Sequence, residues 1–166
     1  MLEHDHRMIA EFKRYWKHYV FQSVAATVSI FVVIFAVNIQ ENPVVIASIG
    51  ATTFIVFAMP NYLTAQPRNI LGGHIVGMVC GFLASIIPLG QLMPDSLAVS
   101  ILYALAVGAS IFIMVVIDTE HPPAAGTALG LAIFGFSLKI TLTLLVSMIF
   151  LTAVHHFCKQ YLRDLT

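Results

Sequence analysis

A chain of 166 residues with 59% apolar and only 10% charged side chains cannot be an ordinary soluble domain, where about a quarter of the residues are charged. Its mean hydropathy of +0.92 indicates an integral membrane protein. The formal net charge is zero, and no basic stretch is interleaved with aromatic residues, so the electrostatic pattern of a nucleic-acid-binding protein is missing.

The first 19 residues, MLEHDHRMIAEFKRYWKHY, are charged and amphipathic, and we expect them to form a cytoplasmic segment. Tyr15, Trp16 and Tyr19 are typical of an anchor at the membrane interface. No small-residue cleavage site follows the first apolar stretch, which argues against a removable signal peptide.

Six apolar stretches follow, and together they predict an all-α, polytopic membrane domain over residues 20–158. A helix needs about 20 residues to cross a bilayer, so four stretches are long enough and two are short. The order is long, short, long, and then the same again. The stretches are 20–37, 44–59, 70–89, 97–117, 124–136 and 138–157. This gives one repeat at about 20–90, a second at about 97–158, and a cytoplasmic tail at 159–166.

The two short stretches begin alike. ENPVVIASIGATTFIVF (41–57) aligns with EHPPAAGTALGLAIFGF (120–136), Glu to Glu and Pro to Pro, at an offset of 79 residues. If each short segment crosses the membrane, each half has three crossings and the two repeats are inverted. If the short segments dip in and return, the protein has four spans and parallel halves.

Basic residues help to choose between these topologies. Both chain ends are rich in Lys and Arg, which places both termini in the cytoplasm in either arrangement. Six crossings also place Arg68 inside and Asp95 outside, although Lys139 then falls outside and Asp118 and Glu120 fall inside. We expect six crossings and inverted repeats.

The second short segment has the features of an anion site. Proline lacks an amide hydrogen and fits the first turn of a helix, so His121 or Pro122, followed by Pro123, marks a helix start. The free amides from Ala124 onward and the positive end of the helix dipole would then attract an anion. Gly126 and Thr127 allow a close approach and offer a hydroxyl, as is typical of membrane helix contacts.

In the first half, Pro43 has the same place, with Asn42 in the position of His121 and Ser48 in that of Thr127. Two such half-helices, entering from opposite sides, are expected to meet head to head at one pocket. The plainer alternatives are that the prolines are turn residues, and that His121 and Asn42 cap helices.

Further candidates lie between the halves. Arg68 can bind a small oxyanion through two parallel hydrogen bonds, or it can simply be a positive-inside residue. His74 lies inside an apolar helix, where it can serve function or bond a neighbouring carbonyl. The glycines at four-residue spacing in this stretch favour a helix-packing face over a ligand contact: Gly72, Gly73, Gly77 and Gly81.

Two motifs together resemble a known family. IGATTFIVFAMPNYLTAQPRNILGGHIVGMVCG (49–81) and EHPPAAGTALG (120–130) are similar to the HPP family of integral membrane proteins, named for the triplet found here at 121–123. The resemblance extends over about 21–157. The family is usually described as four membrane helices, and members in cyanobacteria and chloroplasts are associated with nitrite transport. The resemblance implies a small monovalent oxyanion as substrate.

These patterns predict a transporter or channel for a small inorganic anion, nitrite first, in a bacterial cytoplasmic membrane. The alternative is a membrane signalling or assembly module that transports nothing. No nucleophile, nucleotide or metal pattern indicates an enzyme or a cofactor. We expect a homo-oligomer, a dimer or larger.

Overall fold

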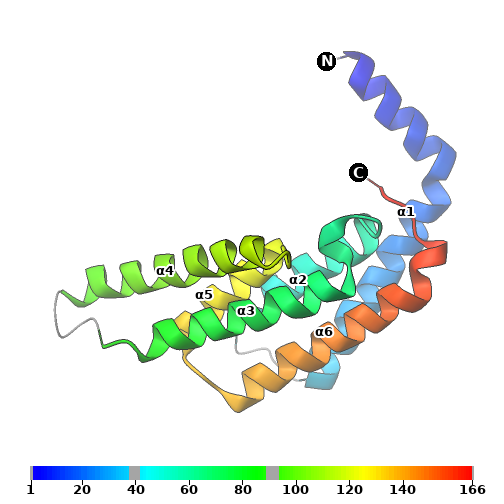
Figure 1. Ribbon diagram of the computed structural model, residues 1–166. Helices are drawn as coiled ribbons and strands as arrows, with labels where there is room; N and C mark the ends of the chain where they lie inside the picture. The colour runs from blue at the N-terminus through cyan, green and yellow to red at the C-terminus, as the bar shows by residue number, and fades with distance from the viewer. Residues whose placement is uncertain (1, 38–41, 89–93, 166) are drawn as a thin grey trace.

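The computed structural model describes residues 2–37, 42–88 and 94–165, and these form a bundle of six α-helices (Figure 1). Two short 3₁₀ turns accompany them, η1 (Leu63–Ala65) and η3 (Lys159–Tyr161). The described residues contain no strand, so the all-α prediction is confirmed. The six helices are α1 (Leu2–Val37), α2 (Pro43–Ala58), α3 (Pro67–Ile86), α4 (Asp95–Val116), α5 (Pro122–Phe134) and α6 (Leu138–Cys158).

The predicted order of long and short segments is present in the helix lengths. Within the described residues, four helices are long and apolar enough to cross a membrane, whereas α2 has 16 residues and α5 has 13. At 1.5 Å per residue, α5 is about 20 Å long, against about 30 Å for the hydrocarbon core of a bilayer. Both short helices begin at a proline, as predicted, because Pro43 and Pro122 occupy positions where no amide is needed.

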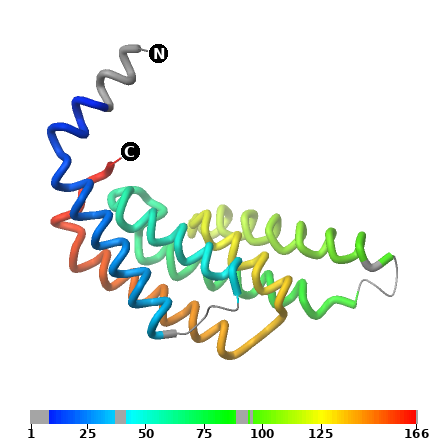
Figure 2. The backbone as a smooth tube through the Cα atoms, turned by 180° about the vertical axis from the view of Figure 1, so that it is seen from behind, coloured from blue at the N-terminus to red at the C-terminus, as the bar shows by residue number. Residues whose placement is uncertain are grey.

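The N-terminal segment continues into the first span as one helix with a kink. Tyr15 has non-helical angles (φ −120°, ψ 17°), and the residues before it project away from the bundle (Figures 1 and 2). The Arg163 guanidinium lies 3.7 Å from the centroid of the Tyr15 ring. Gln22 donates to the Arg163 carbonyl oxygen at 2.8 Å and accepts from its amide at 3.1 Å. The C-terminal segment is therefore tied to α1.

The helices alternate in direction between two ends of the bundle. At one end, His155 of α6 donates to the carbonyl oxygen of Pro60, just after α2, at 2.8 Å. At the same end, Arg68 at the start of α3 pairs with Asp118 just after α4. Contacts along α5 show that α3 runs parallel to it and α2 antiparallel. Each short helix thus connects the two ends of the bundle and does not turn back within it.

The glycine face of α3 is a packing face, as predicted. A Cβ atom on Gly77 would overlap the carbonyl oxygen of Ala124, and one on Gly81 would overlap that of Ala128. A Cβ on Gly73 would lie 2.7 Å from the Cβ of His121. The backbones of α3 and α5 therefore touch over several turns, which only small residues permit.

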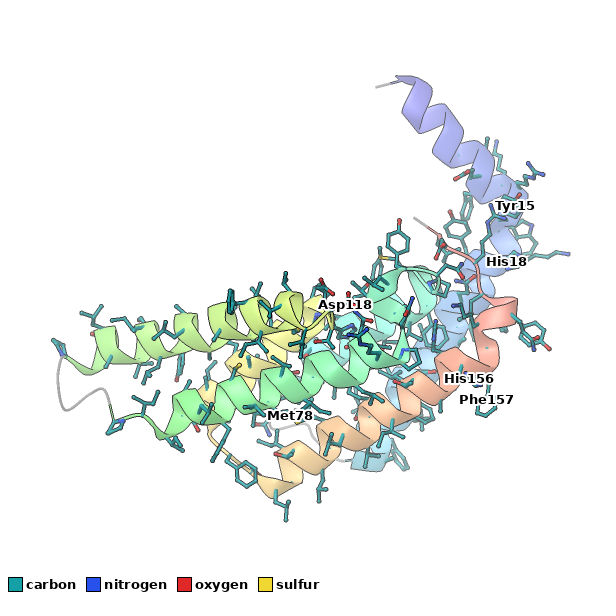
Figure 3. All side chains as sticks on the ribbon, viewed as in Figure 1. Tyr15, His18, Met78, Asp118, His156 and Phe157 are labelled. Atoms are coloured by element: carbon teal, nitrogen blue, oxygen red, sulfur yellow. The ribbon has the colours of Figure 1, made fainter. Side chains whose placement is uncertain are left out.

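The outer helices expose apolar surface. Phe35 of α1 is 78% exposed and Phe112 of α4 is 69% exposed. Figure 3 shows Phe157 projecting from the outer side of α6. In an integral membrane protein such faces contact lipid or another chain. The inner helices α2, α3 and α5 instead enclose the buried polar side chains described next.

Candidate functional site

His74 of α3 points into the bundle and is only 1% exposed. Its Nδ1 atom lies 2.8 Å from the Thr127 hydroxyl of α5. The close approach of α5 follows from Gly73 and Gly77, which flank His74 along α3 and leave room for the neighbouring backbone. His74 thus lies on the face of α3 that packs against α5.

His121 precedes α5 and belongs to the same cluster. Its backbone is extended (φ −143°, ψ 94°), and its side chain makes no capping hydrogen bond. Its Nδ1–H donates instead to the carbonyl oxygen of Thr64 at 2.8 Å, since a carbonyl can only accept. The His121 and His74 rings lie 5.0 Å apart between centroids. His121 and Asn42 thus occupy the N-cap positions of α5 and α2, as the capping alternative expected, but neither side chain makes a capping hydrogen bond.

Thr52 of α2 joins the two histidines. Its hydroxyl lies 3.0 Å from Nε2 of His74 and 3.0 Å from Nε2 of His121. We did not predict Thr52 from the sequence, where it stands in an apolar helix. One signal could have found it: Thr52 follows Ser48 by four residues and so shares its helix face.

Ser48 completes the cluster on the side of the short helices. Its hydroxyl lies 2.8 Å from that of Thr127 and donates to the Pro123 carbonyl oxygen at 2.6 Å. The side chains of this polar chain are 3% exposed or less: Ser48, Thr52, His74, His121 and Thr127. Four of these five residues are sequence-predicted site residues, contributed by three separate segments of the chain: Ser48, His74, His121 and Thr127.

Two cavities border the polar chain. One, of about 510 Å³, is lined by Ser48, Pro122, Pro123 and Gly126 together with apolar residues of α2. The other, of about 340 Å³, is lined by Glu120, His121, Pro122 and apolar residues of α4. The polar chain thus passes from a serine beside the first cavity to a histidine beside the second.

The predicted meeting of the two helix starts is wrong. Val44 and Val45, next to Asn42 and Pro43, contact Gly130, which lies two turns along α5 from Pro122. The two short helices overlap side by side because the small residues of α5 let α2 lie along it. Asn42 and Pro43 are therefore far from the histidine cluster.

The free amides expected after Pro123 are also reduced in number. The amide of Ala124 donates to the His121 carbonyl oxygen at 2.8 Å, so this group is already bonded. With prolines at 122 and 123, the start of α5 contributes backbone carbonyls and side chains to the cluster.

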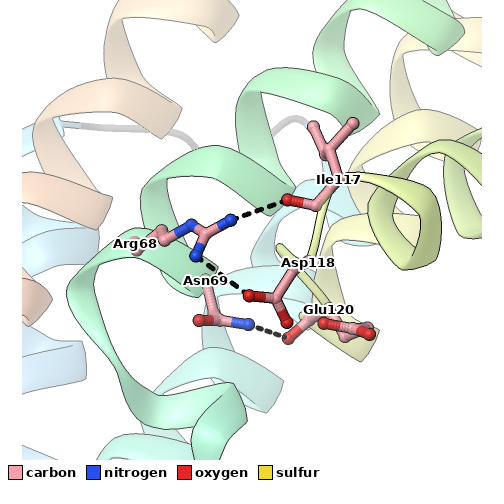
Figure 4. Close-up of polar contacts among 5 residues, drawn as sticks. All are labelled: Arg68, Asn69, Ile117, Asp118 and Glu120. Atoms are coloured by element: carbon pink, nitrogen blue, oxygen red, sulfur yellow. Dashed lines mark hydrogen bonds and ion pairs between the residues drawn. The ribbon is translucent and has the colours of Figure 1, made fainter.

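Arg68 lies at the bundle end, outside the buried cluster, and Figure 4 shows its contacts with Asp118 and Ile117. It donates to the Asp118 carboxylate at 2.9 Å and to the Ile117 carbonyl oxygen at 2.8 Å. Both charged side chains are 62% exposed. Asp118 has a positive φ of 57° and closes α4, with the Thr119 amide donating back to Met114. Arg68 thus holds the turn that leads to His121.

Comparisons with known proteins identify the chain at the family level. The family model described as "HPP, transmembrane region" matches residues 12–163. A transmembrane protein of Dictyostelium discoideum is 37% identical over 89 residues, which are 54% of this chain and 30% of that protein. A second one is 32% identical over 90 residues, 54% of this chain and 28% of the relative. The matched segments thus span less than a third of either relative. No solved structure matches the chain.

Proposed function

Because the chain belongs to the HPP transmembrane family, we propose that it is a membrane transporter or channel for a small inorganic anion, nitrite in the first place. The buried polar chain is the proposed centre of the transport path. This reading combines the resemblance of the HPP segment to nitrite-transporting members with the chemistry of the side chains found there.

The burial of this polar chain is the observation that carries the proposal. Two imidazoles and three hydroxyls lie inside a bundle whose outer faces are apolar. Polar groups within a membrane are costly, and they mark ion and substrate pathways. Small anions need several aligned donors to replace water, and hydroxyls and imidazole N–H groups are such donors.

The proposed entrance is the cavity beside Ser48. It is also lined by Pro122, Pro123 and Gly126, so an anion there lies next to the Ser48 hydroxyl. The Thr127 hydroxyl is one hydrogen bond further into the bundle. His74 and His121 then receive the anion deeper in the bundle. Asn42 and Pro43, at the other end of α2, and Arg68, at the exposed end of α3, are proposed as outer positions on the route.

We include a six-crossing, inverted topology in this proposal. The antiparallel course of α2 and α5 supports it, as does the contact between Ser48 and Thr127, which are 79 residues apart, the offset of the repeat. Arg68 and Arg163 lie at the same end of the bundle, which under the positive-inside rule is the cytoplasmic one. The proposed location is a bacterial cytoplasmic membrane, with the protein as a homo-oligomer.

The test is anion flux into liposomes that carry the purified protein, with nitrite, nitrate, formate and chloride as alternatives. Gly126→Leu should block nitrite flux, because a Cβ at Gly126 faces Ser48 at 3.5 Å and the rest of the side chain fills the cavity. Gly108→Leu is the matched control, since a Cβ there meets no atom within 4 Å. Flux that is unchanged by Gly126→Leu would refute this route.

A signalling or assembly module is the competing function. It would give no flux of any anion in the same liposomes, although the protein is folded and inserted. The exposed apolar faces of α1 and α4 are the surfaces that such a module would offer to a partner.

A further inference from the structure

Six consecutive contacts link two backbone carbonyl oxygens through the polar chain. From the Thr64 carbonyl they run through His121, Thr52, His74, Thr127 and Ser48 to the Pro123 carbonyl. The distances are 2.8, 3.0, 3.0, 2.8, 2.8 and 2.6 Å in that order. At such distances, two electronegative atoms need a hydrogen between them.

When both histidines are neutral, the polar chain has one hydrogen too few for its six contacts. A neutral imidazole has one N–H, a hydroxyl has one O–H, and a carbonyl has none. Five side chains therefore supply five hydrogens for six contacts. A seventh contact, between the Thr52 hydroxyl and the Ser48 carbonyl oxygen at 3.1 Å, widens the shortfall.

If hydrogens are assigned from both ends of the polar chain inward, the missing hydrogen is at Thr52. His121 donates through Nδ1 to Thr64, while Ser48 donates to Pro123, Thr127 to Ser48, and His74 through Nδ1 to Thr127. Both Nε2 atoms are then acceptors, and both face the single hydroxyl hydrogen of Thr52. One added proton on either Nε2 atom completes the six contacts, because an imidazolium donates through both nitrogens.

We propose that His74 and His121 together bind one proton, shared across Thr52, when an anion occupies the adjacent site. This inference rests on the proposed anion transport. The anion offsets the cost of a charged imidazolium in an apolar bundle. A second proton is opposed by the first, since the rings are 5.0 Å apart. The protein then moves one proton with each monovalent anion.

Glu120 provides a route for the proton. Its Oε2 atom is buried and finds no hydrogen-bond partner among the residues that the structure describes. Glu120 and His121 line the same cavity. The Glu120 carboxylate takes a proton from a hydronium ion, which leaves water, and then its O–H bond breaks as an N–H bond forms at Nε2 of His121, directly or through water in that cavity, and the carboxylate is restored.

Few other titratable groups surround the histidine pair. The helices α2 and α5 have none in their sequences. Arg68 and Asp118 are paired with each other at the exposed end. The remaining titratable groups on α3, α4, α6 and the segment between α2 and α3 are Tyr62, Cys80, Tyr103, Lys139, His155, His156 and Cys158, together with Asp95, whose side chain lies outside the described residues. The two histidines and Glu120 are therefore the groups placed to carry the proton.

Two measurements on the full chain test the inference. One is proton uptake by detergent-solubilised protein when nitrite is added in weakly buffered solution. The other is the nitrogen NMR spectrum of protein with labelled histidine, in which an imidazolium shows two protonated ring nitrogens. We expect one proton per chain, and an imidazolium signal that His74→Gln and His121→Gln assign to this pair.

Thr52→Val should abolish the uptake, because no hydroxyl then links the two Nε2 atoms. Thr53→Val is the matched control: Thr53 is the next residue of α2, is also buried, and bonds only the Ile49 carbonyl among the described residues. Proton uptake that survives in Thr52→Val, or that Thr53→Val abolishes equally, would overturn the inference.

The outcomes separate this inference from the proposed function. If nitrite passes without proton uptake, and each ring keeps one unprotonated nitrogen, the inference is overturned but anion transport is still supported. If no anion passes, transport fails, and NMR spectra recorded with and without nitrite decide the inference. An imidazolium that appears at one of the two histidines when nitrite is added supports it, and one unprotonated nitrogen on each ring in the presence of nitrite overturns it.

Discussion

Ser48 and Thr127 are 79 residues apart, the offset at which 41–57 aligns with 120–136, and their hydroxyl oxygens lie 2.8 Å apart. This hydrogen bond joins α2 to α5 where the two short helices lie side by side.

Breaking the Ser48–Thr127 bond should reveal coupling between the halves. Ser48→Ala and Thr127→Val each leave a buried partner unsatisfied and should each cost about 1–3 kcal/mol in the free energy of unfolding. The double variant should cost less than the sum, by about 0.5–3 kcal/mol. Unfolding in mixed detergent micelles measures all four proteins, and strict additivity would show that the bond is not formed.

The glycines of α3 predict a strong effect on stability. Gly77→Leu should destabilise the protein by at least about 1–3 kcal/mol, because its side chain overlaps the backbone of α5. Gly50→Ala is the control: a Cβ there meets no atom within 4 Å, and alanine favours a helix by about 1 kcal/mol. Thermal unfolding in detergent separates the two, and equal midpoints would contradict the packing.

The turn at Asp118 should depend on its backbone more than on its charge. Asp118→Asn removes an exposed ion pair worth about 0–1 kcal/mol and keeps a residue that tolerates positive φ. Asp118→Val adds a β-branched side chain at this φ and should cost about 1–2 kcal/mol more. Chemical unfolding of both variants checks the order, which would reverse if the ion pair dominated.

Arg68 should matter little for anion binding. Its guanidinium already donates to Asp118 and Ile117, so Arg68→Gln should leave the concentration dependence of nitrite flux nearly unchanged. Thr127→Val, by contrast, removes a donor of the central chain and should lower flux roughly tenfold, the equivalent of about 1.4 kcal/mol. A larger loss of nitrite flux in Arg68→Gln than in Thr127→Val would indicate that the anion binds at the surface instead.

The proposed topology can be tested by labelling. Single cysteines at Asp118 and at Lys139, in a variant without Cys80 and Cys158, should react with an impermeant reagent from opposite sides of the membrane. Both positions are exposed, so access depends on the side alone. Labelling of both from one side would restore the four-span arrangement with parallel halves.

Much of the fold could be predicted from the sequence, because helix lengths and starts depend on local chemistry. Apolar stretches and prolines gave five of the six helices within three residues of their observed bounds, whereas α1 begins at Leu2, well before the predicted stretch 20–37. Glycine spacing identified the packing face of α3. His74 and His121 stood out as polar residues in or next to apolar sequence. These features need no knowledge of which helices are neighbours.

The lateral arrangement of the helices could not be predicted in this way. Helix starts that aim at each other and helices that overlap side by side have the same sequence pattern, so the position of Pro43 was misjudged. Thr52 was missed because its role depends on two histidines from other segments. The contacts of Arg68 could not be predicted either, because Asp118 lies 50 residues further along the chain.

The glycine face of α3 also decides which parts can slide. The backbones of α3 and α5 touch each other, whereas α2 meets α5 through side chains. In the proposed transporter, we therefore expect a displacement of α2 along α5, which would separate Ser48 and Thr52 from their partners, to open the path between the two shortest helices.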